Sequence, residues 1–371
     1  MKTARACNLL LVLLVLLFSR ASYAVQYSRS IDYETSQTRA MGGVSIALAN
    51  DRQVLFSNPA GLGPINDKEY SIVQLESEIN DNWQRMSTKV GELSDKETPW
   101  ERAKNNNILN QIVGEHGRIA LSNLSYYLGA ENFGAAFLYQ GITDFEVVNP
   151  VTPKVRASGS IDSVLTGSVA RPVNRPERLF NSDASGWWGA AMKVLSRRTF
   201  DETYYARDFA GLSESDMRKN ERGGTTLDFD FGALWLLKAP WRTNFGFVVK
   251  NIFENEIDPG IGKLRREWGF GASINPLDGS AARYKKLTLA ADYWHLQEKS
   301  DWFSRLRAGA EAWVRPWLAL RCGIRGGYFS GGIGADFKTV RIDLSTYGEE
   351  LGLRAGDKED RRYTLALGIE F

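Results

Sequence analysis

The side chains that carry out most enzyme chemistry are scarce in this chain of 371 residues, which has two histidines and two cysteines. The sequence contains no Gly-x-Ser-x-Gly elbow, His-Glu-x-x-His, Cys-x-x-Cys or Gly-x-x-x-x-Gly-Lys phosphate loop. His295 follows Asp292 closely and could serve as an acid–base pair, but its place at a strand end, before a polar run, favours a loop histidine. We therefore predict no catalytic residue, no metal, no cofactor and no enzyme activity.

Composition narrows the class of protein further. The formal net charge is only +2, whereas nucleic-acid-binding proteins usually carry a large excess of positive charge. Cys7 and Cys322 are too few for a disulfide framework. A chain of this length forms two or three soluble domains or a single large barrel.

The N-terminus has the features of an export signal. Lys2 and Arg5 precede an apolar run over residues 9–18, and small residues around Ala24 fit a cleavage site. The run is too short for a bilayer-spanning helix, which needs roughly 20 residues. We predict a cleaved signal over residues 1–24, so that the mature chain is either an exported soluble β protein or an outer-membrane barrel, because only helices and closed barrels satisfy their backbone in lipid.

The C-terminus reads as an amphipathic strand that ends on an aromatic residue. Small or polar residues alternate there with the apolar set Tyr363, Leu365, Leu367, Ile369 and Phe371. Chain ends of soluble proteins tend to fray, so an apolar terminal strand is unusual in them. It resembles the closing strand of bacterial outer-membrane barrels, in which the terminal aromatic belongs to the signal read by the barrel-assembly machinery.

Charged residues occupy alternate positions inside several apolar strands. We expect one face of these strands to meet lipid and the charged face to line a wet lumen, which favours a membrane barrel over a soluble sandwich. The candidate lumen-facing charges are Asp228, Asp230, Arg307, Glu311, Arg321 and Arg325.

The same period recurs along the chain. Together with the strands above, it gives about 13 candidates, and Thr199–Ala206 is a further one. Because single-chain bacterial barrels have even strand numbers, we predict an all-β fold: a transmembrane antiparallel barrel of about 14 strands. Tryptophan and tyrosine near strand ends fit interfacial girdles, with core packing as the alternative. The remaining candidates lie near residues 70–76, 117–129, 132–141, 158–171, 186–197, 243–253, 267–275, 284–294 and 332–345.

Two polar regions interrupt the strand pattern. Residues 77–116 are predicted to form an extended loop with a short amphipathic helix, whose apolar stripe includes Ile108, Leu109 and Ile112. The stripe packs on the barrel rim or, alternatively, receives an apolar solute. Residues 201–223 are predicted to form a charged external loop.

A glycine-rich motif follows the signal. It reads Ala-Met-Gly-Gly at residues 40–43, Ala-Asn-Asp at 49–51 and Asn-Pro-Ala-Gly at 58–61. The glycines permit close backbone approach and positive φ, while Pro59 fixes its own φ and Asn58 can bond the turn that it starts. The motif resembles the N-terminal hatch of the FadL/TodX family of fatty-acid and hydrocarbon transporters and its relatives, the PorV-like and TraF-like exported barrels.

The resemblance implies that residues 25–66 form a hatch inside a barrel made by residues 67–371. The hatch residues carried over are Met41, Gly42, Gly43, Asn58, Pro59, Ala60 and Gly61. The implied function is passive uptake of hydrophobic small molecules such as long-chain fatty acids across the outer membrane of a diderm bacterium, gated by the hatch.

The alternative is a non-transporting outer-membrane scaffold for secretion or surface-protein assembly, of the PorV or TraF kind. The expected partners are outer-membrane lipid, hydrophobic small molecules and the barrel-assembly machinery, and no nucleic acid.

Overall fold

The computed structural model describes most of the chain after the predicted signal. The predicted export signal over residues 1–24 and the Ala-Asn-Asp stretch at 49–51 lie outside the described residues. The described ranges are 33–48, 52–65, 67–93, 98–129, 132–149, 151–174, 184–205, 220–238, 241–277, 286–296, 302–352 and 354–371.

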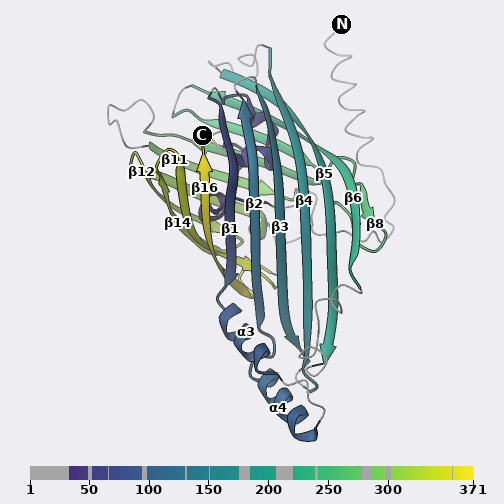
Figure 1. Cartoon of the computed structure of the whole chain (residues 1–371). Coiled ribbons are helices and arrows are strands. Elements are labelled where there is room, and N and C mark those ends of the chain that lie inside the picture. Colours follow the sequence, from purple (N-terminus) through teal and green to yellow (C-terminus); the bar gives the residue numbers. More distant parts are fainter. Residues whose placement is uncertain are drawn as a thin grey trace.

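Fourteen antiparallel strands form a closed barrel (Figure 1), as the sequence predicted. Strands that follow one another in the chain pair around the barrel, except that β7 pairs with β10, and β1 pairs with β16 to close it. The strands are β1 Glu69–Asn80, β2 His116–Gly129, β3 Phe133–Val148, β4 Lys154–Pro172, β5 Ala184–Tyr205, β6 Arg222–Leu237, β7 Asn244–Lys250, β10 Glu267–Ile274, β11 Lys286–Trp294, β12 Leu306–Arg315, β13 Leu318–Arg325, β14 Tyr328–Asp336, β15 Val340–Glu350 and β16 Glu359–Glu370. A separate hairpin joins β8 Glu256–Asp258 to β9 Gly262–Lys263.

Two strand predictions need correction. The single strand expected over residues 332–345 is two strands, β14 and β15, joined by a tight turn at residues 337–339. This turn has no glycine or proline to mark it; Asp336 Oδ1 instead accepts a hydrogen bond of 2.9 Å from Lys338 N, and Lys338 has φ +71°. The stretch 199–206 adds no strand, because residues up to Tyr205 continue β5.

The barrel wall is apolar outside and polar inside. In β16, Tyr363, Leu365, Leu367 and Ile369 are between 39% and 48% exposed, whereas the alternating Arg362, Thr364 and Glu370 are buried. An apolar outer face around a polar interior is the arrangement of a barrel that stands in lipid. Within the described residues, no helix is long and apolar enough to cross a membrane.

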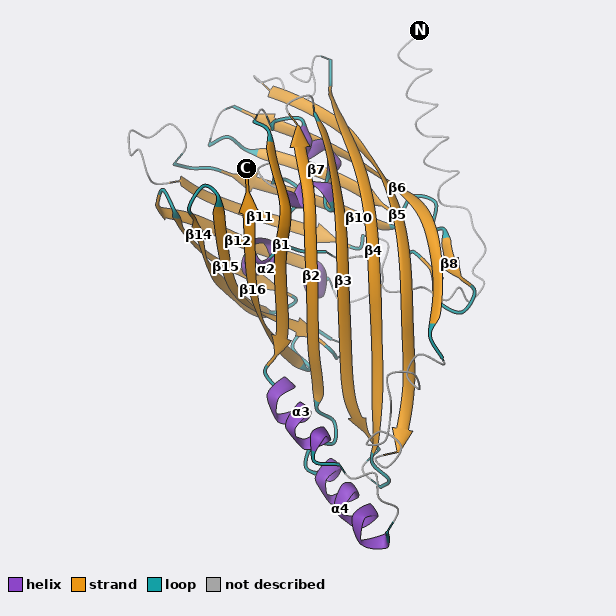
Figure 2. Cartoon of the chain, viewed as in Figure 1, coloured by secondary structure: helices purple, strands orange, loops and turns teal. Residues whose placement is uncertain are grey.

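Helices α3 Trp83–Gly91 and α4 Pro99–Asn110 lie at one end of the barrel, far from the C-terminus (Figure 2). We call this the helical end, and the end with Phe371 the terminal end. The expected loop over 77–116 is therefore shorter than predicted and holds two helices, because β1 continues to Asn80. Met86, Leu109 and Ile112 pack with Val147 of β3 and Val155 of β4, so the apolar stripe covers the protein's own strands where they extend beyond their neighbours.

Candidate functional site: the plugged lumen

Most of the described residues before β1 lie inside the barrel. We call residues 33–48 and 52–65 the luminal segment; it contains α2 Ser36–Ala40 and two 3₁₀ turns, η1 Arg52–Leu55 and η2 Pro59–Leu62. Helix α2 contacts β13, β14, β15 and β16, while η2 contacts β4, β5 and β6. The segment thus contacts different parts of the wall and lies in the lumen between them (Figure 2).

Inward-facing glycines let the backbone of the luminal segment lie against the strands. A Cβ on Gly309 would lie 2.1 Å from the carbonyl oxygen of Met41, and one on Gly323 only 2.4 Å from Gly42 N. Gly42 and Gly43 themselves have φ of +71° and +85°, a backbone that favours glycine. This is where the structure places the first half of the predicted hatch motif.

The second half of the motif joins the luminal segment to itself and to β6. Asn58 caps η2 by accepting a hydrogen bond of 3.1 Å from Ala60 N, and Pro59 occupies the first position of the turn. The Asn58 amide also donates to the carbonyl oxygens of Ile46, at 2.8 Å, and Ala233, at 3.2 Å. Asn58 is fully buried, so these bonds decide how the two halves of the segment sit together.

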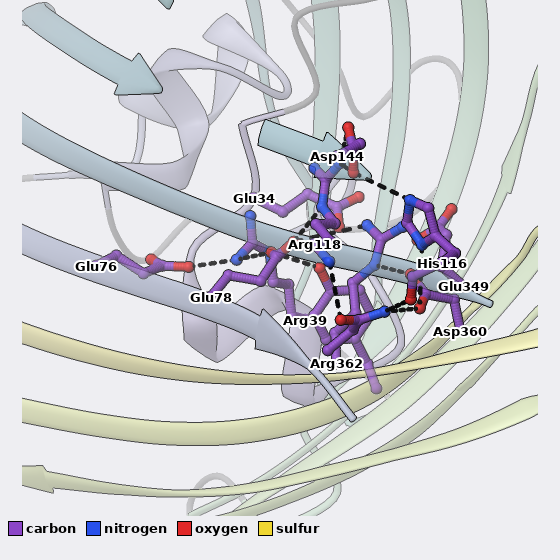
Figure 3. Close-up of polar contacts among 12 residues, drawn as sticks. Glu34, Arg39, Glu76, Glu78, His116, Arg118, Asp144, Glu349, Asp360 and Arg362 are labelled. Carbon is purple, nitrogen blue, oxygen red and sulfur yellow. Dashed lines mark hydrogen bonds and ion pairs between the residues drawn. The ribbon is translucent and has the colours of Figure 1, made fainter. Parts of the chain in front are cut away.

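Arg39 of α2 binds two carboxylates of β1 (Figure 3). Its Nη1 lies 2.6 Å from Glu76 Oε1 and 2.8 Å from Glu78 Oε2. Glu78 also pairs with Arg118 of β2 at 2.7 Å and accepts a hydrogen bond of 2.7 Å from the Tyr347 hydroxyl. The sequence does not reveal this cluster, because the loop predicted over residues 77–116 includes Glu78. The available signal is the alternation of Glu76, Glu78 and Asn80 along an extended β1.

The predicted lumen-facing charges on β12 and β13 also hold the luminal segment. Arg307 and Arg325 pair with Glu34 at 2.7 Å and 2.5 Å. Glu311 accepts hydrogen bonds from Gln37 of α2, at 3.0 Å, and from Arg321, its partner across the two strands, at 2.7 Å. The structure therefore brings these four charges together around the segment.

The two aspartates of β6 have a different role. Asp230 pairs with Lys193 of β5 at 2.8 Å. Asp228 accepts backbone hydrogen bonds from Phe253, at 3.1 Å, and Asn255, at 3.2 Å. Asp228 thereby holds the chain between β7 and β10 against the inner wall, and no strand period predicts such a contact.

A polar chamber of about 170 Å³ borders α2. Positive and negative side chains line it from the luminal segment and from both sides of the barrel, as expected for a space that holds water. Its charged lining residues are Glu34, Arg39, Glu78, Arg118, Asp162, Arg197, Arg325, Glu349 and Arg362.

One part of the inner wall is apolar instead. Leu124, Leu138, Val164 and Leu195 are consecutive register partners on β2, β3, β4 and β5, and each is at most 1% exposed. We call this row the apolar wall. It belongs to a single buried cluster with Val54, Leu55, Phe56 and Leu62 of the luminal segment and with Ile257, Ile261 and Leu264 of the β8–β9 region.

These features define a closed β-barrel whose lumen holds the luminal segment. No protein family matches the sequence, and no curated protein does either. The barrel is similar to a solved deltaS2 mutant of the TodX monoaromatic hydrocarbon channel, with a TM-score of 0.50 and 11% identity over 91% of this chain and 97% of that one. The TodX deltaS2S3 mutant gives a TM-score of 0.50 at 10% identity, over 91% and 98%.

The CymD monoaromatic hydrocarbon channel is a further neighbour, with a TM-score of 0.49 and 11% identity over 94% of this chain and 98% of that one. At such identities the likeness concerns the fold alone. The fold is the one that the resemblance to the FadL/TodX family predicted, and the solved neighbours are named as channels rather than enzymes.

Proposed function

We propose that this protein is an outer-membrane channel through which small hydrophobic molecules cross passively. The observation that carries the proposal is the apolar wall inside the lumen, because the interior of a membrane barrel is ordinarily polar. The helical end would face outward, since outer-membrane barrels carry their longer connections on the outside.

The path we propose follows the apolar wall. Residues 52–62 of the luminal segment cover the wall with Val54, Leu55, Phe56 and Leu62. Fully burying one such side chain is worth about 1.5–3 kcal/mol, so displacing them into water is unfavourable. An apolar solute that takes their place against the wall offsets much of that cost, and exchange of this kind needs no external energy source.

Long-chain fatty acids are the narrower form of the proposal. Sequence resemblance supports them, and so does the charge next to the wall: Gln140, Asp162 and Arg197 form the neighbouring inward row, one step toward the helical end. This row lines the polar chamber, which five arginines and four carboxylates surround. Such a polar chamber accepts the carboxylate of a fatty acid more readily than it accepts a bare hydrocarbon. Measuring uptake of both kinds of solute therefore distinguishes a fatty-acid channel from a channel for hydrophobic molecules in general.

The test is uptake of labelled toluene and oleate by cells that express the full chain in a host without its own hydrophobic-compound channels. We expect saturable uptake above the empty-vector level, and higher uptake in the Leu55→Ala, Leu62→Ala double variant, which empties space along the wall. Met41→Ala is the matched control, because Met41 is equally buried in the luminal segment but packs with Val44 and Ala290. Uptake at the empty-vector level in all variants contradicts the proposal.

A non-transporting scaffold is the second candidate. It is supported by the many polar ties between the luminal segment and the wall, and by α3 and α4, which project from one end of the barrel (Figure 1). A barrel that folds in the outer membrane, takes up neither solute and loses a secretion or surface-assembly phenotype when residues 83–110 are removed would support this role.

A further inference from the structure

The seam between β1 and β16 is the pairing with the largest sequence separation in the barrel. Backbone register runs from Ser71 opposite Glu370 to Asn80 opposite Arg362, and Tyr70 stacks on Phe371 with ring centroids 5.4 Å apart. Bringing such distant strands together costs more chain entropy than forming any neighbouring hairpin. A chain segment that binds both strands at the same time reduces this entropic cost.

Side chains of helix α2 bind strands on both sides of the seam. Ser36 Oγ is 2.9 Å from Thr364 Oγ1 on β16, and Arg39 Nη1 is 2.8 Å from Glu78 Oε2 on β1. Glu78 and Thr364 are direct register partners. One short helix therefore binds both members of a single cross-strand pair, from side chains three positions apart. Ser36 Oγ also lies 3.1 Å from Ser345 Oγ, which extends the contact to β15.

Arg52 makes a second tie from the same segment. Its Nη1 lies 3.0 Å from Glu370 at the end of β16, and its Nη2 lies 3.9 Å from Asp343 of β15. Arg52 is 1% exposed and precedes β1 by fewer than twenty residues. Because the luminal segment is covalently joined to β1, each bond that it makes to β16 raises the effective concentration of one seam strand near the other.

The buried carboxylates of β1 need a positively charged partner from the luminal segment. Glu76 and Glu78 lie on the same inward face and are 4% and 2% exposed. Among the described residues, Arg39 is the one cation within ion-pair distance of Glu76. Removing one partner of a buried pair leaves an uncompensated charge. A β1 strand that closes without Arg39 would therefore carry a buried, unpaired carboxylate next to the seam.

We infer that the luminal segment has a second role, as an internal template for barrel closure: α2 and Arg52 bind β1 and β16 together and hold the seam shut. This role is independent of any solute, because it concerns the two strands rather than the apolar wall. It assigns Ser36, Arg39 and Arg52 to closure, and it leaves Asn58 and Glu34, which bind other strands, outside it.

The experiment measures closure at the seam by oxidative cross-linking in isolated outer membranes. Leu75 and Leu367 are outward-facing register partners of β1 and β16, and both are replaced by cysteine in a Cys322→Ser background. The reference pair is Leu320→Cys with Ile333→Cys, the equivalent outward partners on β13 and β14. In Arg39→Met we expect most of the seam cross-link to be lost while the reference cross-link is kept.

Glu34→Gln is the matched control, since it also removes buried ion pairs of the luminal segment, but to β12 and β13. It should affect both cross-links equally. If Arg39→Met yields no folded barrel in membranes, the rate at which the full chain refolds into detergent is measured instead, for the parent, Arg39→Met and Arg39→Lys. The lysine keeps the positive charge, so Arg39→Lys should refold faster than Arg39→Met. Seam yield in Arg39→Met equal to that of the parent, or an equal fall of both cross-links, overturns the inference. Uptake of toluene plays no part in this readout.

Discussion

At the scale of single residues, small and polar side chains fix where the backbone of the luminal segment lies. Gly309 and Gly323 let its backbone contact the strands directly, and Asn58 ties its two halves to β6. The sequence indicated the glycine pair at residues 42–43 and the Asn-Pro turn. It did not indicate the glycines of the wall, because nothing in a strand pattern tells which inward glycine faces a chain segment instead of water.

Gly309→Ala should loosen the luminal segment. The new Cβ would lie 2.1 Å from the Met41 carbonyl oxygen, so the segment must move, at a cost of about 1–3 kcal/mol for an overpacked site. We expect a lower temperature for the shift from the folded to the unfolded band on gels. Gly141→Ala is the control, since a Cβ there meets nothing within 4 Å. Equal shifts for both variants would show that the segment does not press on β12.

Asn58→Ala tests the tie between the halves. The change leaves the buried carbonyl oxygens of Ile46 and Ala233 without the amide, and an unsatisfied buried group costs about 1–3 kcal/mol. We expect the urea midpoint of the band shift to fall, whereas Ser57→Ala, which removes one bond to the Gln53 carbonyl oxygen, should change it less. An unchanged midpoint in Asn58→Ala would mean that other contacts fix the segment.

At the scale of elements, the strand period was enough to place most of the barrel. It failed where the signal that ends a strand was missing, as at the turn of residues 337–339, and where a strand continued into a charged stretch, as β1 does to Asn80. Alternation identifies the two faces of a strand, but not how far beyond its neighbours the strand extends. Strands β3, β4 and β5 are long and extend beyond their neighbours at the helical end. Helices α3 and α4 cover outward-facing apolar residues of this extension, such as Val147 and Val155.

Leu109→Ala should weaken the packing of α4 without opening the barrel. Leu109 is fully buried, and such truncations cost about 2–5 kcal/mol where the cavity cannot collapse. We expect faster proteolysis within residues 83–110 and an unchanged temperature of the band shift, because α4 touches the outer side of the strands. Trp100→Ala, at a side chain that is 78% exposed, serves as the control. A band shift that moves with Leu109→Ala would place these helices within the cooperative barrel.

At the scale of the whole molecule, the lumen has two kinds of wall. Ion pairs and polar hydrogen bonds join the luminal segment to β1 and β11–β16, whereas leucine and valine face it from β2–β5. Charged positions were predictable as inward-facing from their alternation. Their partners were not, since Arg39 and Glu34 lie far from them in the sequence and only the closed barrel brings them together.

The outer face of the barrel allows a test of the membrane assignment that does not depend on transport. Cys322 is exposed near the middle of β13, between outward-facing Ala310 and Gly331. In a soluble β protein an arginine at such a position would be solvated and nearly neutral for stability. In lipid the same arginine costs about 2–4 kcal/mol near the bilayer midplane.

We therefore expect Cys322→Arg to lower the temperature of the band shift in membranes strongly, and Cys322→Leu to leave it unchanged or raise it. Val151→Arg is the control for the added charge: Val151 is 86% exposed in the connection between β3 and β4, beyond the common wall, and its replacement should have little effect. Because lipid alone penalises the charge at residue 322, equal stability of the two arginine variants would favour an exported soluble protein over a membrane barrel.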